Sequence, residues 1–113
     1  MKLPNFQNAF IDIQKLRDYS LNQNHSRGKH KARLFAAILD LQSADADILE
    51  EIIRNAINQE EAILGMQDQY GQRYTVDFEI TRNQNTAPVR TTWIIRPDED
   101  FPRLTSCFIV RKR

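Results

Sequence analysis

The chain has 113 residues, of which 41% are hydrophobic and 27% are charged, and this length and composition fit one globular domain over residues 1–113. No apolar run approaches the roughly 20 residues that cross a bilayer, and residues 1–10 lack the apolar centre of a secretory signal, so we expect a cytoplasmic protein without a membrane segment. The single cysteine, Cys107, excludes an internal disulfide, and its place in an alternating apolar run predicts a buried side chain.

The net charge of +1 conceals a strong polarity along the chain. Residues 1–41 carry a net charge of +4, residues 42–72 carry −6 and residues 73–113 carry +3. A fold with this distribution can present a positive face to a polyanion while the whole molecule stays nearly neutral. The alternative is that the charges are solvated or paired within the molecule.

Helical spacing of apolar residues dominates the first half of the chain. Helices are expected over residues 13–20, 29–41 and about 44–64. Asp12 and Ser43 are the expected N-caps of the first and third helices, because their side-chain oxygens accept backbone N–H groups of a first turn. Gly65 is expected to end the third helix, and residues 66–71 form a loop.

From Tyr74 onward the apolar residues alternate with polar ones, which indicates strands. Strands are expected over residues 74–80, 89–96 and 104–111, with turns at residues 82–85 and 97–100. Three consecutive strands with short turns form an antiparallel meander, and the preceding helices must cover one of its faces. The predicted fold class is therefore α+β, with N-terminal helices packed on a C-terminal three-stranded antiparallel meander.

The turn and helix start over residues 21–35 concentrate titratable and cationic side chains. They are His25, His30, Arg27, Lys29, Lys31 and Arg33. The only glycine before Gly65 is Gly28, which marks where this turn must bend. Lys31 stands in the first turn of the second helix, where a cation opposes the helix dipole and is tolerated for packing or for use.

Metal and nucleotide sites are not indicated, so no metal and no other cofactor is expected. His25 and His30 have no cysteine cluster or carboxylate–histidine helix motif beside them. Gly28 and Lys29 lack the upstream glycine and the following hydroxyl residue of a phosphate-binding loop. The carboxylates at residues 98–100 lie in a turn, where solvation explains them.

Metal-independent cleavage of RNA fits the residues present. It requires a base for the 2′-hydroxyl proton, an acid for the leaving 5′-oxygen and cations for the charged phosphorane. His25 is the candidate acid or base, Lys31 and Arg103 are candidates to hold the phosphate, and Thr105 is the candidate hydrogen-bond donor. The alternative for each is a solvated surface side chain.

Further residues are candidates to bind nucleic acid without taking part in catalysis. They are Arg27, Lys29, Arg33 and the ring of Tyr70, which lies beside Gly71 in a predicted loop. Tyr74 and Trp93 occupy alternating apolar positions, so core packing is favoured for both.

The residues quoted above also match a known pattern. The shared motif, L-N-x-x-H-x-x-G-x-x-K-A-x-x-F, is carried here by Leu21, Asn22, His25, Gly28, Lys31, Ala32 and Phe35. With Leu3–Asn5, Lys15–Tyr19, Tyr70–Gly71, Tyr74, Trp93 and Pro102–Thr105, the chain resembles a family of small bacterial domains of unknown function. The proline of that family's His-Pro-x-Gly turn is Ser26 here, which affects the rigidity of the turn.

Members of that family occur alone or as C-terminal domains, sometimes encoded beside a second small protein as in toxin–antitoxin pairs. The order of helices followed by a meander is also similar to the barnase, EndoU, colicin and RelE-like ribonuclease toxins, although a fold does not fix a function. The resemblance implies a bacterial toxin-like protein with a cognate antitoxin or another small protein as partner, and the chemistry of the residues above adds RNA as an expected partner.

Three hypotheses follow from the sequence. The first is a metal-independent toxin-like ribonuclease that uses general acid–base catalysis. The second is a non-catalytic module that binds a partner protein through its acidic third helix or its basic turn. The third is a plain nucleic-acid-binding domain.

Overall fold

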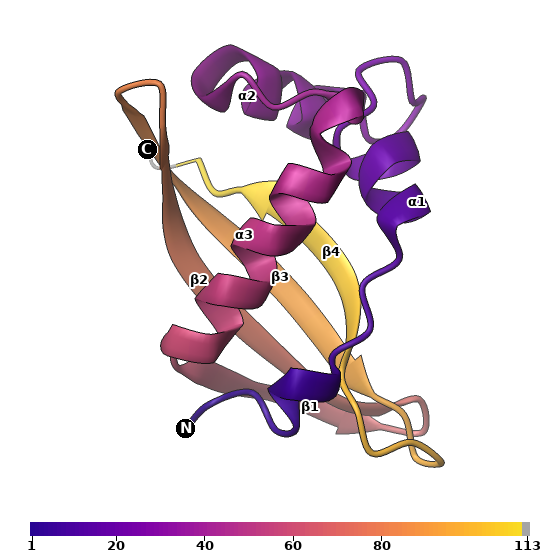
Figure 1. Ribbon diagram of the computed structural model, residues 1–113. Coiled ribbons are helices and arrows are strands. Elements are labelled where there is room, and N and C mark those ends of the chain that lie inside the picture. Colours follow the sequence, from indigo (N-terminus) through magenta and orange to yellow (C-terminus); the bar gives the residue numbers. More distant parts are fainter. Residues whose placement is uncertain (112–113) are drawn as a thin grey trace.

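The computed structural model describes residues 1–111 as an antiparallel sheet with helices on one face (Figure 1). The helices are α1 (Ile13–Lys15), continued by a π-helical turn (Leu16–Ser20), α2 (Lys29–Leu39) and α3 (Ala46–Gln59). The strands are β1 (Ala62–Asp68), β2 (Gly71–Arg82), β3 (Asn85–Ile95) and β4 (Arg103–Ile109), in the spatial order β1-β2-β3-β4. The α+β prediction is confirmed, but the described chain has four strands and not three.

The extra strand is β1, which the sequence assigned to the end of the third helix and a loop. α3 ends at Gln59, and Glu60 already has extended dihedral angles of φ −91° and ψ 154°. The residues that follow pair with β2, beginning with Ala62 opposite Val76. Gly65 does not end a helix; it lies where β1 shifts register between Leu64 and Gln67. Long-range pairing with β2 outweighs the helical spacing of this segment, a competition that local sequence does not reveal.

The helix ends show which capping predictions hold. Asp12 caps α1 as expected, since its Oδ1 accepts the backbone N–H of Gln14 at 3.0 Å. α2 ends at Leu39, two residues early, because Asp40 takes a left-handed conformation with φ 53°. Ser43 does not cap α3. A short 3₁₀ turn over Ser43–Asp45 precedes that helix.

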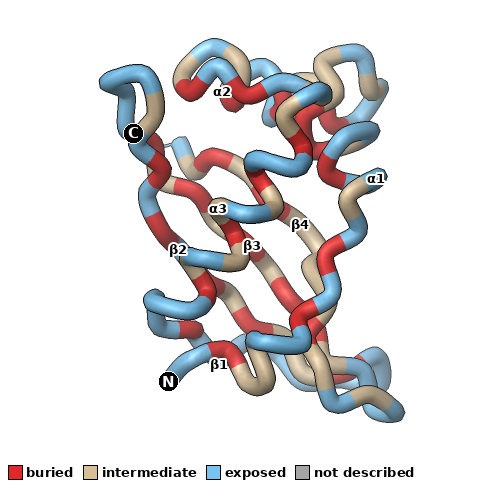
Figure 2. The backbone as a smooth tube through the Cα atoms, viewed as in Figure 1, coloured by how far each residue is buried: buried red, intermediate tan, exposed pale blue. Residues whose placement is uncertain are grey.

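The helices and the inner face of the sheet share one hydrophobic core, visible as the buried segments along α3 and the central strands in Figure 2. Its largest fully buried side chains include Leu16, Phe35, Leu49, Ile53, Val76, Val89 and Trp93. The expected burial of Tyr74 and Trp93 is confirmed, with exposed fractions of 8% and 1%. The hydroxyl of Thr91 is buried too, and it is satisfied by accepting from Trp93 Nε1 and donating to the carbonyl of Val76.

The strands are joined by tight turns. Asn83 and Gln84, both with positive φ, connect β2 to β3, as the predicted turn over residues 82–85 requires. At the other end of β2, Gly71 has φ 137°, and a Cβ atom built on it would stand 2.2 Å from the carbonyl oxygen of Ile95. Glycine at this position therefore permits the close approach of β2 and β3. Within residues 1–111, no helix is long and apolar enough to cross a membrane.

Replacing Gly71 should be costly. We expect Gly71→Ala to lower the free energy of unfolding by more than about 2 kcal/mol, because the added Cβ meets backbone and the positive φ is strained. Gly65→Ala is the matched control: its Cβ would stand 3.2 Å from the carbonyl of Arg73, and we expect a loss below about 1 kcal/mol. Denaturant unfolding of both variants checks this, and equal losses would contradict it.

Cys107 should be unreactive in the native protein. Its side chain is only 5% exposed, and burial raises the pKa of the thiol to about 12. Because the thiolate is the nucleophile, we expect alkylation by iodoacetamide at neutral pH to be much slower in the folded protein than after unfolding in guanidinium chloride. Mass spectrometry of both samples measures the rates, and similar rates would contradict the burial.

Candidate functional site

His25 closes the turn that precedes α2. Its Nδ1 accepts the backbone N–H groups of Arg27 and Gly28, each at 3.0 Å. The imidazole and the ring of Tyr19 pack in an edge-to-face arrangement, with ring centroids 4.6 Å apart. Since Nδ1 is an acceptor, the neutral ring carries its proton on Nε2. The histidine thus has a structural task in this turn, and Nε2 is the atom left for chemistry.

Gly28 is required at this turn because of a close contact. Its φ is −87°, which any residue can adopt. A Cβ atom here would stand 2.8 Å from the carbonyl oxygen of Tyr19. The turn folds back on the π-helical turn so tightly that only a residue without a side chain fits.

Lys31 lies beside β4, the strand at the opposite edge of the sheet from β1. Its Nζ stands 4.2 Å from the ring centroid of Phe108, a cation–π contact. Lys31, His30, Leu34 and Phe108 line an open hollow of about 370 Å³. The ammonium group is therefore held beside the C-terminal half of β4.

Arg103 and Thr105 share a second hollow, here called the β4 cleft. It has a volume of about 220 Å³, and its lining includes Phe10, Asp12, Lys15, Arg96, Arg103 and Thr105. The Arg103 guanidinium lies between the rings of Phe10 and Phe101, 4.9 and 5.1 Å from their centroids. The structure thus brings two of the predicted site residues together with two further cations.

Arg103 is partly neutralised by Glu99. Its Nε and Nη2 each donate to one carboxylate oxygen of Glu99 at 2.7 Å. These hydrogen bonds lower the pKa of the Glu99 carboxyl and raise the pKa of the Arg103 guanidinium. An anion that enters the cleft must compete with Glu99 for this arginine.

Thr105 belongs to a cluster of hydroxyl groups. The pairing of β3 with β4 shifts register after Thr92, and Thr105 is the extra residue of β4. The Thr92 hydroxyl lies 2.6 Å from Thr105 Oγ1 and 2.5 Å from Ser106 Oγ. Lys15 Nζ donates to the carbonyl of Thr105 at 2.8 Å. Hydroxyl donors and an ammonium group therefore meet at one irregular point of the sheet.

The four residues proposed for catalysis do not form one cluster. Phe108, which Lys31 contacts, lies five positions after Arg103 on β4, about 16 Å along the strand. His25 is engaged by its own turn and by Tyr19. No local sequence pattern marks Lys15, Arg96 and the nearby Asp12 as site residues, because they reach Arg103 only through tertiary contacts.

The residues proposed for nucleic-acid binding lie at two ends of the molecule. Arg27, Lys29 and Arg33 belong to the turn and helix α2, which cover one end of the sheet (Figure 1). Tyr70 is 62% exposed, as expected, in the β1–β2 turn. The following residue, Gly71, packs against Ile95 and Arg96, so Tyr70 is at the same end of the sheet as the β4 cleft.

In residues 1–111, no group of three or more His, Cys, Asp or Glu side chains is arranged to hold a metal ion. The polar groups that line the β4 cleft are the cations Lys15, Arg96 and Arg103, the hydroxyl group of Thr105 and the Asp12 carboxylate.

Comparison with known proteins identifies the family and the fold. A family model described as a domain of unknown function, DUF6883, matches residues 2–111. No curated protein matches the chain. Among solved structures, a chain of the contact-dependent growth inhibition toxin–immunity protein complex from Klebsiella pneumoniae 342 is similar, with a TM-score of 0.64 and 16% sequence identity. The match covers 88% of this chain and 98% of that chain, and at this identity it shows a shared fold.

The structural task of His25 can be tested separately from any catalytic one. We expect His25→Ala to lower the free energy of unfolding by about 1–3 kcal/mol, because two backbone N–H groups lose their acceptor. His25→Asn should keep most of the stability, since an asparagine side-chain oxygen can accept from backbone N–H groups two or three residues on. Urea unfolding measures both, and an unchanged stability of His25→Ala would refute the capping role.

Proposed function

We propose that this chain, which belongs to the DUF6883 family, is a toxin-like domain that binds RNA in the β4 cleft and cleaves it without a metal ion. The observation that carries the proposal is the convergence of Lys15, Arg96 and Arg103 on one open cleft with the hydroxyl group of Thr105. Two of these four residues were singled out from the sequence alone.

The chemistry of the cleft suits a phosphodiester. Arginine guanidinium groups bind phosphate oxygens through paired N–H donors, and lysine adds a point charge. The carboxylates near the cleft include Asp12, with one oxygen committed to its helix, Glu99, which is paired with Arg103, and Asp98, whose charge also raises the pKa of Arg103. The exposed ring of Tyr70, at the same end of the sheet, offers a surface on which a base can stack.

Cleavage would follow from attack by the neighbouring 2′-hydroxyl. Its oxygen bonds to phosphorus, its proton passes to a base, the bond from phosphorus to the 5′-oxygen breaks, and that oxygen takes a proton from an acid. The products are a 2′,3′-cyclic phosphate and a 5′-hydroxyl. Lys15, Arg96 and Arg103 would stabilise the phosphorane charge, and Thr105 would donate a hydrogen bond. Asp12, which lines the cleft, is the candidate proton carrier, whereas His25 lies outside the cleft in the turn before α2 and is not given this role.

The fold supports a role in a toxin–immunity system. The similar solved chain comes from a complex of a growth-inhibition toxin with its immunity protein, and it is matched over nearly its whole length. By analogy, the present chain would also have a small protein that binds it. Apolar side chains exposed on β1, namely Ile63, Leu64 and Met66, favour a protein-binding module as the second candidate function.

Expression in a bacterial host tests the proposal directly. We expect induction of the wild type to arrest growth and fragment RNA, and Arg96→Gln and Arg103→Gln each to abolish both effects while the protein stays folded. Lys2→Gln is the matched control, because Lys2 bonds to the carbonyl of Gln59, away from the cleft residues. Normal growth with intact RNA on wild-type expression would contradict cleavage.

The same variants separate binding from chemistry when affinity for a single-stranded RNA oligonucleotide is measured against salt. Loss of one phosphate contact should reduce the slope of log K against log salt by about 0.7. Glu99→Gln should strengthen binding, because it releases Arg103 from its ion pair. Asp12→Asn keeps a good helix cap, so loss of cleavage with unchanged RNA affinity in this variant would identify Asp12 as a proton carrier.

A further inference from the structure

The sheet has an open edge on the side opposite β4. β1 is much shorter than β2, and its first residue, Ala62, pairs with Val76. From Asp77 to Arg82, β2 therefore has β3 on one side and no strand on the other within residues 1–111. Figure 1 shows this part of β2 continuing beyond β1 toward the hairpin tip.

The backbone of this edge is set to accept another strand. The carbonyl of Pro88 accepts the N–H of Val110, so the backbone of Pro88 faces β4 and not β2. Its partner in β2 is Glu79. In an antiparallel pair of this kind, the N–H and C=O of Glu79 point away from β3, and those of Asp77 and Thr81 follow by alternation. The open edge thus presents aligned donors and acceptors, the requirement for adding a strand.

Beside this edge lies an open groove of about 590 Å³, here called the β2 groove. Its apolar lining includes Ile52 and Ala56 of α3 and Phe78 of β2. Ile48 continues the same stripe of α3 one turn earlier and is 37% exposed. In a strand added to β2, every second side chain would face α3 and cover this part of the helix.

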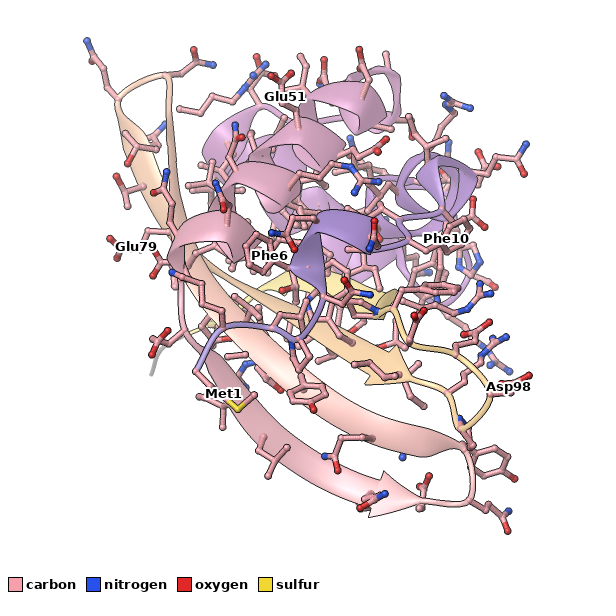
Figure 3. The ribbon with its side chains drawn as sticks, turned by 60° about the horizontal axis from the view of Figure 1, so that its bottom comes forward. Met1, Phe6, Phe10, Glu51, Glu79 and Asp98 are labelled. Atoms are coloured by element: carbon pink, nitrogen blue, oxygen red, sulfur yellow. The ribbon has the colours of Figure 1, made fainter. Side chains whose placement is uncertain are left out.

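The charge of the groove selects the partner. Its charged lining residues are Glu60, Asp77 and Glu79, all acidic. Asp77 is paired with Arg90, while Glu60 and Glu79 are exposed and have no ion-pair partner in the described chain. In Figure 3, Glu79 stands at the free side of the sheet, with Glu51 on the exposed side of α3. Like charges opposite each other destabilise paired strands, so a second copy that offered the same edge would be repelled.

We infer that the β2 groove binds an extended basic segment of a partner protein, which adds to β2 as a further strand. Side chains of that segment that lie on the α3 side are apolar and contact Ile52, Ala56 and Phe78. The alternate side chains are lysine or arginine and lie beside Glu79 and Asp77. The open run spans about 17 Å, which a segment of roughly six residues matches. This inference stands on the edge and groove alone and does not depend on RNA cleavage.

A defined probe tests the inference on the full chain. It is a fluorescent peptide of about eight residues in which lysine and valine alternate. We expect it to bind, and we expect amide resonances of Asp77, Glu79 and Thr81 to shift and gain protection from hydrogen exchange. A peptide of the same composition with its lysines and valines in separate blocks should bind far more weakly. Equal binding of the two peptides would overturn the inference.

Matched charge variants and blocked peptides complete the test. Glu79→Lys should weaken binding by about tenfold or more, whereas Asp98→Lys, the same change of charge at the opposite side in Figure 3, should leave it nearly unchanged. In an added strand, the backbone N–H groups of either the lysines or the valines, but not of both, point toward β2. N-methylation of that set should abolish binding, whereas N-methylation of the other set should leave binding intact. Equal effects of the two charge variants, or tolerance of both methylated peptides, would overturn strand addition. The inference would also be overturned if the free chain formed a dimer and Glu79→Lys dissociated it, because a second copy would then occupy the groove.

Discussion

The packing of α3 across one face of the sheet is the constraint on which the rest of the structure depends. Leu49, Ile53 and Ile57 of α3 are buried in the same core as Val76 and Trp93, and each such side chain stabilises the fold by about 1.5–3 kcal/mol. A helix is about 10 Å wide, whereas four strands at about 4.8 Å spacing span roughly 15 Å. One helix cannot cover such a sheet, so the rest of its inner face depends on other parts of the chain, among them α2.

The N-terminal segment supplies the cover for the β4 edge. The N–H of Phe10 donates to the carbonyl of Pro102 at 2.8 Å, and the N–H of Leu104 donates to the carbonyl of Phe10 at 3.0 Å. Arg54 of α3 ties the same segment down by donating to the carbonyl of Ala9 at 3.0 Å. These hydrogen bonds pair part of the exposed backbone at the edge of β4. They also position Asp12 and Lys15 at the β4 cleft. The contacts that cover the edge of β4 therefore also form the site.

Sequence patterns predicted the elements whose structure is decided by neighbouring residues. Alternation identified the last three strands, and helical spacing located three helices with one correct cap, Asp12. β1 could not be predicted because its apolar residues also fit a helix, and only pairing with β2 distinguishes the two. Arg103 and Thr105 share the cleft because they are two residues apart on one strand, whereas Lys15 reaches them across almost the whole chain. The turn of His25 was recognised, but its hydrogen bonds to backbone were not.

Folding places the cationic β4 cleft and the acidic β2 groove at different edges of one sheet. The cations Lys15, Arg96 and Arg103 lie at β4, while Glu60 and Glu79 lie at the open edge of β2. A polyanion and a basic segment are therefore attracted to different edges and do not compete for the same residues. A partner strand held at β2 would leave the β4 cleft open, because the two sites are about 15 Å apart across the sheet and roughly 20 Å apart along the strands. If such a partner neutralises the domain, the strand serves as its anchor, and inhibition must come from the rest of the partner reaching over the outer face to the cleft.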